Sequence, residues 1–218
     1  MFESHPLFPT SYFAPLPLMA AMLQKTNSRE FGGTLHIEKC ETFPKQTHRN
    51  RTVIITSNGP ITLSVPVVRP HGTHSTTSEI TVSYAEHWNI IHWRTIMTSY
   101  NSSPYFLYYR DELENILLKH YECLLELNQT ILHFILKKMK SDCEIVYTEI
   151  FQKPGSTTND YRERYDYKKK ESTPYIPPYS QVFLDRQPFY PCVGCLDLLF
   201  NLGPQARDYL MKMDIQLQ

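Results

Sequence analysis

The chain has 218 residues, 41% hydrophobic and 20% charged, which is typical of a water-soluble globular protein and fits a single domain over residues 1–218. The 22 lysines and arginines balance 22 aspartates and glutamates, and this zero net charge argues against DNA or RNA as the main partner. Seven glycines are few, and neither glycine-rich nucleotide-binding pattern occurs.

The apolar stretch near the start predicts neither a signal peptide nor a membrane span. It reads YFAPLPLMAAML, contains two prolines and has no basic leader before it. Five cysteines, an odd number, favour reduced thiols over a disulfide framework. We therefore expect a cytoplasmic protein.

The first third of the chain predicts strands around one short helix. A helix is expected from Pro17 to about Lys25, since proline is tolerated in a first turn. The clearest signal is TVIITSNGPITLSVPVV at 52–68, where two β-rich runs flank Asn58-Gly59, a strong hairpin cue. The other early elements are a strand at 35–43 that ends near Cys40, a surface loop at 69–78 and a strand at 79–84.

Helices are predicted from Trp88 onward. One is expected to end near Tyr100, and a second helical region at 105–139 carries a one-sided apolar stripe with a break near His120. A polar, proline-bounded segment at 152–178 predicts a mobile loop or lid. The remaining expected elements are strands at 143–151 and 180–183 and helices at 196–203 and 204–213.

This order of elements predicts the fold class. Strands come early, helices dominate the middle, and single strands return later. The pattern favours an α+β fold with a mixed, largely antiparallel sheet. We expect a β-hairpin region toward the N-terminus, with the helical middle and C-terminus packed on the sheet.

The run KQTHRNR gathers cations in an otherwise neutral chain. If it lies in a strand, Arg49 and Arg51 share one face, and His48 and Asn50 share the other. Two guanidinium groups on one face suit a carboxylate, phosphate or pyrophosphate. The alternatives are a solvated strand face, or arginines paired with structural acids such as Glu38 or Glu41.

The helix after Trp88 supplies a second candidate group. Trp88 and His92 are one turn apart and share a face, whereas Arg94 lies well round from both. His92 suits a general base, because its unperturbed pKa lies near neutrality. Trp88 suits stacking on a sugar or base. The alternative is a half-buried aromatic helix.

Two further groups lie at expected helix ends. Asn101, Ser102 and Ser103 precede Pro104, where a serine caps the next helix or exposed amides hold a phosphate. Asp197 and Asn201 share a helix face and point into a cleft, or serve in the first turn and at the C-cap.

A C-x-x-C pair, Cys192 and Cys195, has no second pair at comparable spacing, so no metal site is predicted. Roles in redox chemistry or as a single acyl-carrying cysteine remain minor alternatives. His71 and His74, in the long loop, are interpreted mainly as solvated histidines.

Several stretches together resemble the WbqC-like protein family. They are PTSYFAPLPLMAAML, KQTHRNR with TVIITSNGPITLSVPV, HWNIIHWRTIMTSYNSSPYFLYY and YSQVFLDRQPFYPCVGCLDLLFNLGP. The resemblance extends over nearly the whole chain except near 152–178. One departure is His48, where an aromatic residue is common in the family.

The resemblance implies a process, the biosynthesis of bacterial O-antigen or other surface polysaccharide. It implies an acyl- or aminoacyl- (glycine-) transferase acting on an amino sugar or nucleotide-linked sugar, with no cofactor. The alternative is a non-catalytic module that binds a nucleotide sugar or glycan. Catalytic candidates are His92 and Asp197. Substrate-binding candidates are Arg49, Asn50, Arg51, Trp88, Arg94, Asn101, Ser102 and Asn201.

Overall fold

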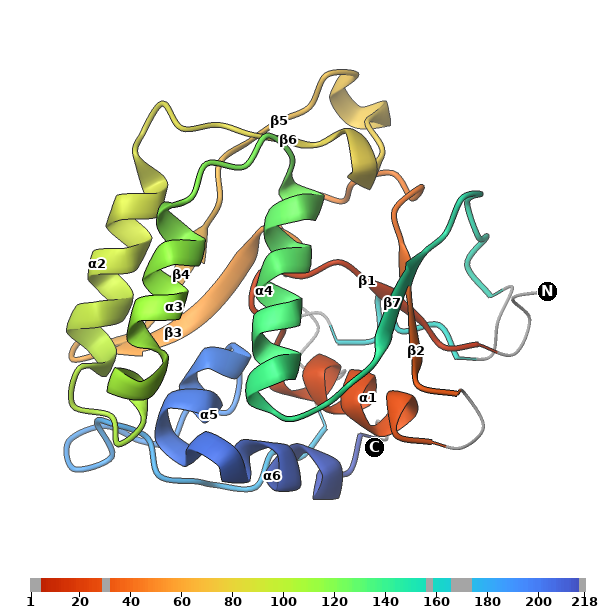
Figure 1. Cartoon of the computed structure of the whole chain (residues 1–218). Coiled ribbons are helices and arrows are strands. Elements are labelled where there is room, and N and C mark those ends of the chain that lie inside the picture. Colours follow the sequence, from red (N-terminus) through yellow and green to blue (C-terminus); the bar gives the residue numbers. More distant parts are fainter. Residues whose placement is uncertain (1–4, 29–31, 156–158, 166–173, 216–218) are drawn as a thin grey trace.

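The computed structural model describes residues 5–28, 32–155, 159–165 and 174–215. The fold is α+β, as predicted (Figure 1). Within the described ranges, none of the helices combines the length and apolar character needed to cross a lipid bilayer. The helices are α1 (Leu16–Thr26), α2 (Trp88–Tyr100), α3 (Phe106–Leu118), α4 (Leu124–Lys138), α5 (Cys195–Leu202) and α6 (Ala206–Lys212). The strands are β1 (Leu7–Pro9), β2 (Thr34–Glu38), β3 (Arg51–Thr56), β4 (Gly59–Ser64), β5 (Val67–Val68), β6 (Thr81–Val82) and β7 (Glu144–Tyr147).

The largest sheet is parallel. Its order is β1-β2-β7, and β1, α1 and β2 form a β-α-β unit. On the open side of β1, the Leu7 amide donates to the Asn159 carbonyl and the Tyr161 amide donates to the Leu7 carbonyl, so residues 159–161 continue the sheet in parallel. The prediction of a mixed, largely antiparallel sheet therefore fits in part: β3–β4 and β5–β6 pair antiparallel, whereas the three-stranded sheet is parallel, because short strands distant in sequence pair side by side.

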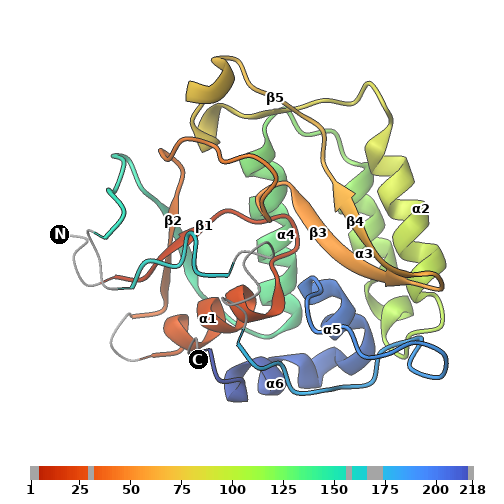
Figure 2. The same cartoon turned by 180° about the vertical axis from the view of Figure 1, so that it is seen from behind.

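The predicted hairpin is confirmed at β3–β4, whose register runs from Arg51–Ser64 to Thr56–Gly59. Gly59 has φ +105°, which glycine adopts readily. Figure 2 shows the hairpin in front of α2, and β3 packs against that helix. The strand expected at 79–84 shrinks to β6, because Thr76 and Glu79 form a capping box around the 3-10 turn Thr77–Glu79.

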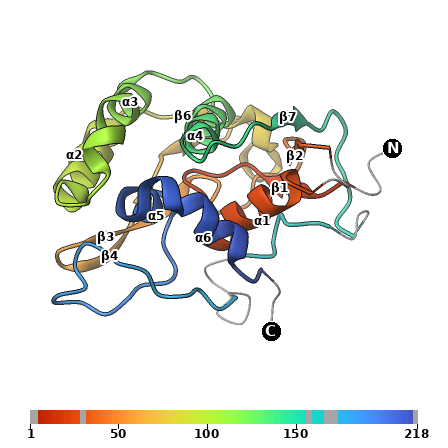
Figure 3. The ribbon, with the colours of Figure 1, turned by 60° about the horizontal axis from the view of Figure 1, so that its bottom comes forward.

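The break expected near His120 is confirmed, since α3 ends at Leu118 and α4 begins at Leu124. The predicted apolar stripe is buried at its leucine, isoleucine and phenylalanine positions, whereas His120 is exposed. Helices α2 and α3 lie side by side at the opposite end of the molecule from the parallel sheet (Figure 3).

The C-terminal helices tie the two ends of the chain together. Helix α5 is buried, and Gly203 follows it with φ +54°. The Gln24 side-chain amide donates to the Leu210 and Met213 carbonyls, which fixes α6 against α1. Both predicted helices are confirmed, but residues 180–183 form no strand. There the Gln181 side chain turns inward to Asp197 and Tyr190.

The segment expected to form a lid is partly packed into the fold. Tyr161 and Tyr165 are buried, and the Tyr161 ring stacks on Phe8 with a centroid separation of 4.8 Å. Two stretches of the same segment, 156–158 and 166–173, lie outside the described residues.

Candidate functional site

Polar side chains collect where the parallel strands end. Strand β2 ends at Glu38, Thr148 directly follows β7, and Arg162 follows the 159–161 extension. Parallel strands present their carboxyl ends at one edge, and ligands of open parallel sheets bind outside that edge. This edge is therefore the expected position of a ligand site.

Glu38 is the centre of a buried hydrogen-bond network. Its Oε1 accepts from the Cys40 amide at 2.7 Å and from the Thr148 hydroxyl at 2.6 Å. Its Oε2 accepts from the Gln152 amide at 2.9 Å and lies 3.6 Å from Arg162 Nη1. With so many partners, this carboxylate has a structural task, which is to bind the three strand ends together.

Two buried arginines complete the cluster. Arg162 donates from Nε to Asp160 Oδ1 at 2.9 Å and from Nη2 to Oδ2 at 2.5 Å, a fork-to-carboxylate pair. Arg49 donates from Nε to Glu41 Oε1 at 2.7 Å, and its Nη2 lies 2.6 Å from the same oxygen. Arg49 Nη2 also donates to the Arg162 carbonyl at 3.4 Å, so the two pairs are neighbours.

The two carboxylates respond in opposite directions. Burial raises the pKa of Glu41, and the Arg49 guanidinium offsets this only in part. Burial also acts on Asp160, but hydrogen bonds from Arg162 outweigh it and hold the pKa of Asp160 below its ordinary value. Glu41 is therefore the stronger base, and both Arg49 contacts end on its Oε1, leaving Oε2 out of that pair.

Two hollows open beside this cluster. The Arg164 hollow has a volume of about 440 Å³, and the Lys45 hollow about 200 Å³. They share Arg162 and Glu163. The Arg164 hollow is lined by Glu41, Thr42, Phe151, Pro154, Asp160, Arg162, Glu163 and Arg164. The Lys45 hollow is lined by Pro44, Lys45, Thr47, His48, Arg49, Arg162 and Glu163.

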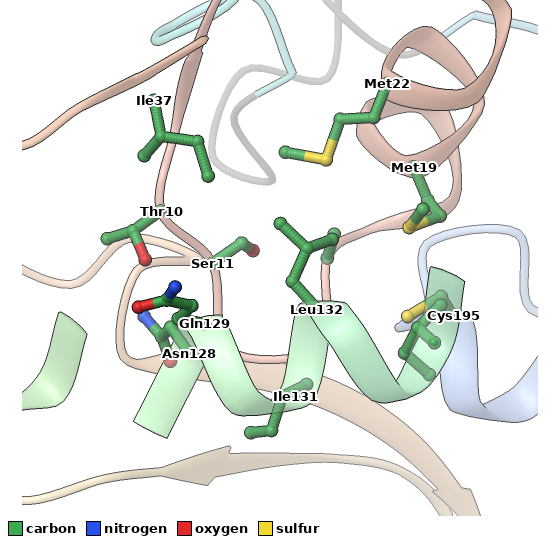
Figure 4. Close-up of a pocket in the computed structure, with 12 residues that line it drawn as sticks. Thr10, Ser11, Met19, Met22, Ile37, Asn128, Gln129, Ile131, Leu132 and Cys195 are labelled. Atoms are coloured by element: carbon green, nitrogen blue, oxygen red, sulfur yellow. The ribbon is translucent and has the colours of Figure 1, made fainter. Parts of the chain in front are cut away.

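Two other spaces are weaker candidates. A hollow of about 540 Å³ lies at the amino edge of the sheet, beside Gly33 and Glu144, and no buried charge cluster borders it among the described residues. An interior cavity of about 10 Å³ lies between α1, α4 and β2. Figure 4 shows Thr10, Ser11 and Asn128 at one end of it and Met19 and Cys195 at the other. That volume holds about one water molecule, not a substrate.

The predicted arginine pair is not assembled as expected. Strand β3 begins at Arg51, and Arg49 lies in the preceding turn. A hydrogen bond from the Asn50 amide to the Thr47 carbonyl closes this turn. Arg49 and Arg51 therefore do not share one face of a strand. Arg49 instead pairs with Glu41, which was the alternative given for this arginine. Asn50 donates its side-chain amide to the Val65 carbonyl at 2.9 Å. Arg51 is half-buried and lines neither hollow.

The aromatic group on α2 is interior. His92 Nδ1 lies 2.9 Å from the Tyr12 hydroxyl, and the Trp88 ring meets the His92 ring edge-on at 5.1 Å. Burial lowers the pKa of His92 to about 4, against a hydrogen bond to the Ser64 backbone. Trp88 and His92 thus lie together, as predicted from their spacing, but inside the core. Arg94 is exposed.

Asp197 also lies inside the protein. Its carboxylate accepts from the Tyr100 hydroxyl at 2.9 Å, the Tyr179 hydroxyl at 2.5 Å and the Gln181 amide at 3.0 Å. Burial raises the pKa of Asp197. His92 and Tyr100 are two turns apart on α2, a rise of about 12 Å, so the structure does not bring His92 and Asp197 together.

The remaining candidates have local tasks. Asn201 donates its side-chain amide to the Asp197 carbonyl at 2.7 Å, one turn earlier in α5. Asn101 and Ser102 are exposed in the turn after α2. Helix α3 begins at Phe106 without a side-chain cap, so the expected serine N-cap is wrong.

Sequence reasoning missed most of the residues at the carboxyl edge. Asp160 and Arg162 fall in a polar stretch that was interpreted as a loop, and Glu38 and Glu41 entered only as partners for arginines. The one local signal is the Asp160-x-Arg162 spacing, which puts both side chains on one side of an extended segment. Within the described residues, no group of three histidine, cysteine or carboxylate side chains suited to a metal ion is found.

The fold and the site define an α+β protein with a polar, mixed-charge site at the carboxyl edge of a small parallel sheet. The model of the WbqC-like protein family matches residues 34–169, which is more than half of the chain. The chain therefore belongs to the WbqC-like protein family. The matched residues include the whole buried cluster from Glu38 to Arg162 and exclude α1, α5 and α6. Neither the curated proteins nor the solved structures contain a significant match.

Proposed function

We propose that this protein is a transferase that places an acyl or aminoacyl group on the amine of an amino sugar or nucleotide-linked sugar, for surface polysaccharide. The observation that carries the proposal is the Arg164 hollow, where carboxylates and guanidinium groups line one space at the carboxyl edge. Such a mixed lining suits a substrate that carries both an amine and an anionic group.

The acids of this hollow have different tasks in the proposal. Glu163 is exposed, and no guanidinium group of the described residues forms an ion pair with it, so it attracts the substrate ammonium group. Glu41, whose pKa is raised by burial, is the general base. Asp160 is held by Arg162 and keeps that side chain in place.

The reaction is a nucleophilic acyl substitution. The bound ammonium group first loses one proton to solvent. The neutral amine then attacks the acyl carbonyl carbon, a C–N bond forms, and the bond from that carbon to the donor's leaving group breaks. Glu41 takes the proton that the amine loses and returns it to the leaving group. His92 and Asp197 take no part, since their polar atoms are engaged inside the core.

The test is an assay with candidate amino-sugar nucleotides and activated acyl or aminoacyl donors, with the product detected by mass spectrometry. We expect Glu41→Gln to reduce kcat by about a hundredfold or more, the usual contribution of a positioned general base. Glutamine keeps an acceptor for Arg49 but removes its counter-ion, so the melting temperature should fall, and kcat is compared at a temperature at which both proteins are folded. Glu144→Gln, at the amino edge of the same sheet, is the matched control.

No product across the panel, with unaltered surface polysaccharide in a deletion strain, would rule the transferase out. Substrate binding without turnover, equal in wild type and Glu41→Gln, would instead identify a glycan- or nucleotide-sugar-binding module. The buried Arg49–Glu41 pair is compatible with both a transferase and a binding module, so the assay must measure turnover.

A further inference from the structure

We propose that the Lys45 hollow binds a phosphate or diphosphate group, which makes the substrate of the adjoining Arg164 hollow a phosphate-linked amino sugar. This assignment rests on the proposed function for the amine end of the substrate and adds a separate subsite for the anionic end. The hollow holds about 200 Å³, enough for a phosphoryl group and part of its neighbour.

Among the described residues that line the Lys45 hollow, Lys45 is the cation without an acid partner. Arg49 is neutralised by Glu41, and Arg162 by Asp160. The Lys45 side chain is exposed, and no acid of the described chain lies within ion-pair distance of it. An ammonium group that lines a concave surface without a counter-ion is a ready partner for a phosphate oxygen.

Hydrogen-bond donors surround the same space. Thr47 Oγ1 accepts long bonds of 3.4 Å from the Arg49 amide and from Arg49 Nη1, and it keeps its own hydroxyl hydrogen. That Nη1 makes no closer contact with any described residue, so Arg49 also retains donor capacity toward the hollow.

His48 supplies an independent observation. The imidazole is buried and lines the hollow, and its Nε2 has no hydrogen-bond partner among the described residues. Leaving a buried polar nitrogen unpaired costs about 1–3 kcal/mol, which a ligand oxygen would recover. Burial lowers the pKa of His48 to about 3, so the ring is neutral and offers one N–H donor.

The two hollows are joined through Arg162 and Glu163. Among the described residues, Glu163 is the one carboxylate that lines the Lys45 hollow, and it opposes an anion there. The same carboxylate attracts an amine in the Arg164 hollow. The wall formed by Arg162 and Glu163 thus separates the amine end of the substrate from its phosphate end. Phe151, half of its ring area exposed, adds an apolar face to the Arg164 hollow for a sugar or base.

The experiment is calorimetric titration of the full chain with inorganic phosphate, diphosphate and acetate at low ionic strength. We expect both phosphates to bind and acetate to bind more weakly. Lys45→Ala should weaken phosphate binding about tenfold, and His48→Phe, which keeps a ring and loses both nitrogens, about fivefold. Glu163→Gln should tighten it, because a like charge is removed. Lys212→Ala, on α6 and lining neither hollow, is the control.

Equal phosphate affinity in Lys45→Ala and Lys212→Ala would overturn the assignment, as would acetate binding at least as tightly as phosphate. Melting temperatures of the variants show whether a loss reflects misfolding. Glu41→Gln should not weaken phosphate binding, because it frees the charge of the Arg49 guanidinium that lines the hollow. Phosphate binding without any transfer would refute the proposed reaction alone, and transfer without phosphate binding would refute this subsite alone.

Discussion

His48 and His92 are buried as neutral rings. Burial lowers the pKa of His92 to about 4 and that of His48 to about 3, from an ordinary value of 6.5. An unfolded chain releases both rings to water, where they take up protons near pH 6.5. Each ring therefore links folding to pH.

The His92 contribution to stability is complete above pH 6.5 and is lost as the pH falls toward 4, because only the unfolded state binds the proton in that window. Between pH 7 and pH 5 we expect a loss of about 2 kcal/mol from this ring. His92→Gln should remove that part of the pH dependence. The measurement is urea unfolding of both proteins at each pH.

His74→Gln serves as the control, since His74 is exposed in a surface turn and its removal should leave the slope of stability against pH unchanged. A His92→Gln profile parallel to wild type would show that the ring gains a proton in the folded state, contrary to its burial.

At this scale the sequence predicted contacts within one element better than contacts between elements. The Trp88–His92 pair was predicted because a helix fixes the spacing of its own side chains. The sequence did not predict that Arg49 and Arg162 lie next to each other, because strand pairing across more than a hundred residues sets their positions. Roles for His92 and Asp197 were inferred from residue type, which carries no information on burial.

Elements with local signals were predicted well. Asn58-Gly59 specified the hairpin, and the apolar stripe specified α3 and α4. The parallel sheet had no such signal. Strand β1 is three residues that include a proline, and β7 is four, too short for periodicity to distinguish them from loop.

Gly194 shows how tightly two of these elements meet. Its amide donates to the Val53 carbonyl, and it begins helix α5 beside β3. A Cβ at this position would lie 2.2 Å from Thr52 Oγ1 and 3.0 Å from the Phe13 carbonyl oxygen. Gly194→Ala should therefore destabilise the protein by about 1–3 kcal/mol or more, as overpacking does. Urea unfolding measures the loss.

A double-mutant cycle isolates the cause. Thr52→Ala removes the nearer obstacle, although it also removes the bond from Thr52 to the Phe13 carbonyl. Gly194→Ala should then cost less in the Thr52→Ala background, by at least about 0.5 kcal/mol. Strict additivity would mean that the backbone shifts freely at Gly194 and the contact is not tight.

The family match and the folding unit do not coincide. Residues 34–169 contain the charged cluster, but β1 pairs with β2 from outside that range, and α5 supplies the fully buried Leu198, Leu199 and Phe200. A chain reduced to 34–169 lacks β1 and α5 and would expose the apolar surface that these elements cover. We expect it not to fold cooperatively, whereas residues 1–218 should show one sharp transition.

Thermal unfolding followed by circular dichroism, together with the rate of limited proteolysis, compares the two chains. A cooperative transition in the shorter chain would show that the matched range is autonomous. Adding residues 174–218 as a separate polypeptide would then test whether α5 and α6 dock onto it.

The parallel sheet also sets when this protein can fold. His36 pairs with Val146, and Leu7 hydrogen-bonds to Asn159 and Tyr161, so each of the first two strands has one partner that is made more than a hundred residues later. During synthesis the early strands must wait, with their edges open, until almost three quarters of the polypeptide has left the ribosome. Non-local pairing of this kind folds slowly and exposes strand edges meanwhile. The nascent chain thus exposes an edge of β1 and an edge of β2 until residues 144–161 have been made.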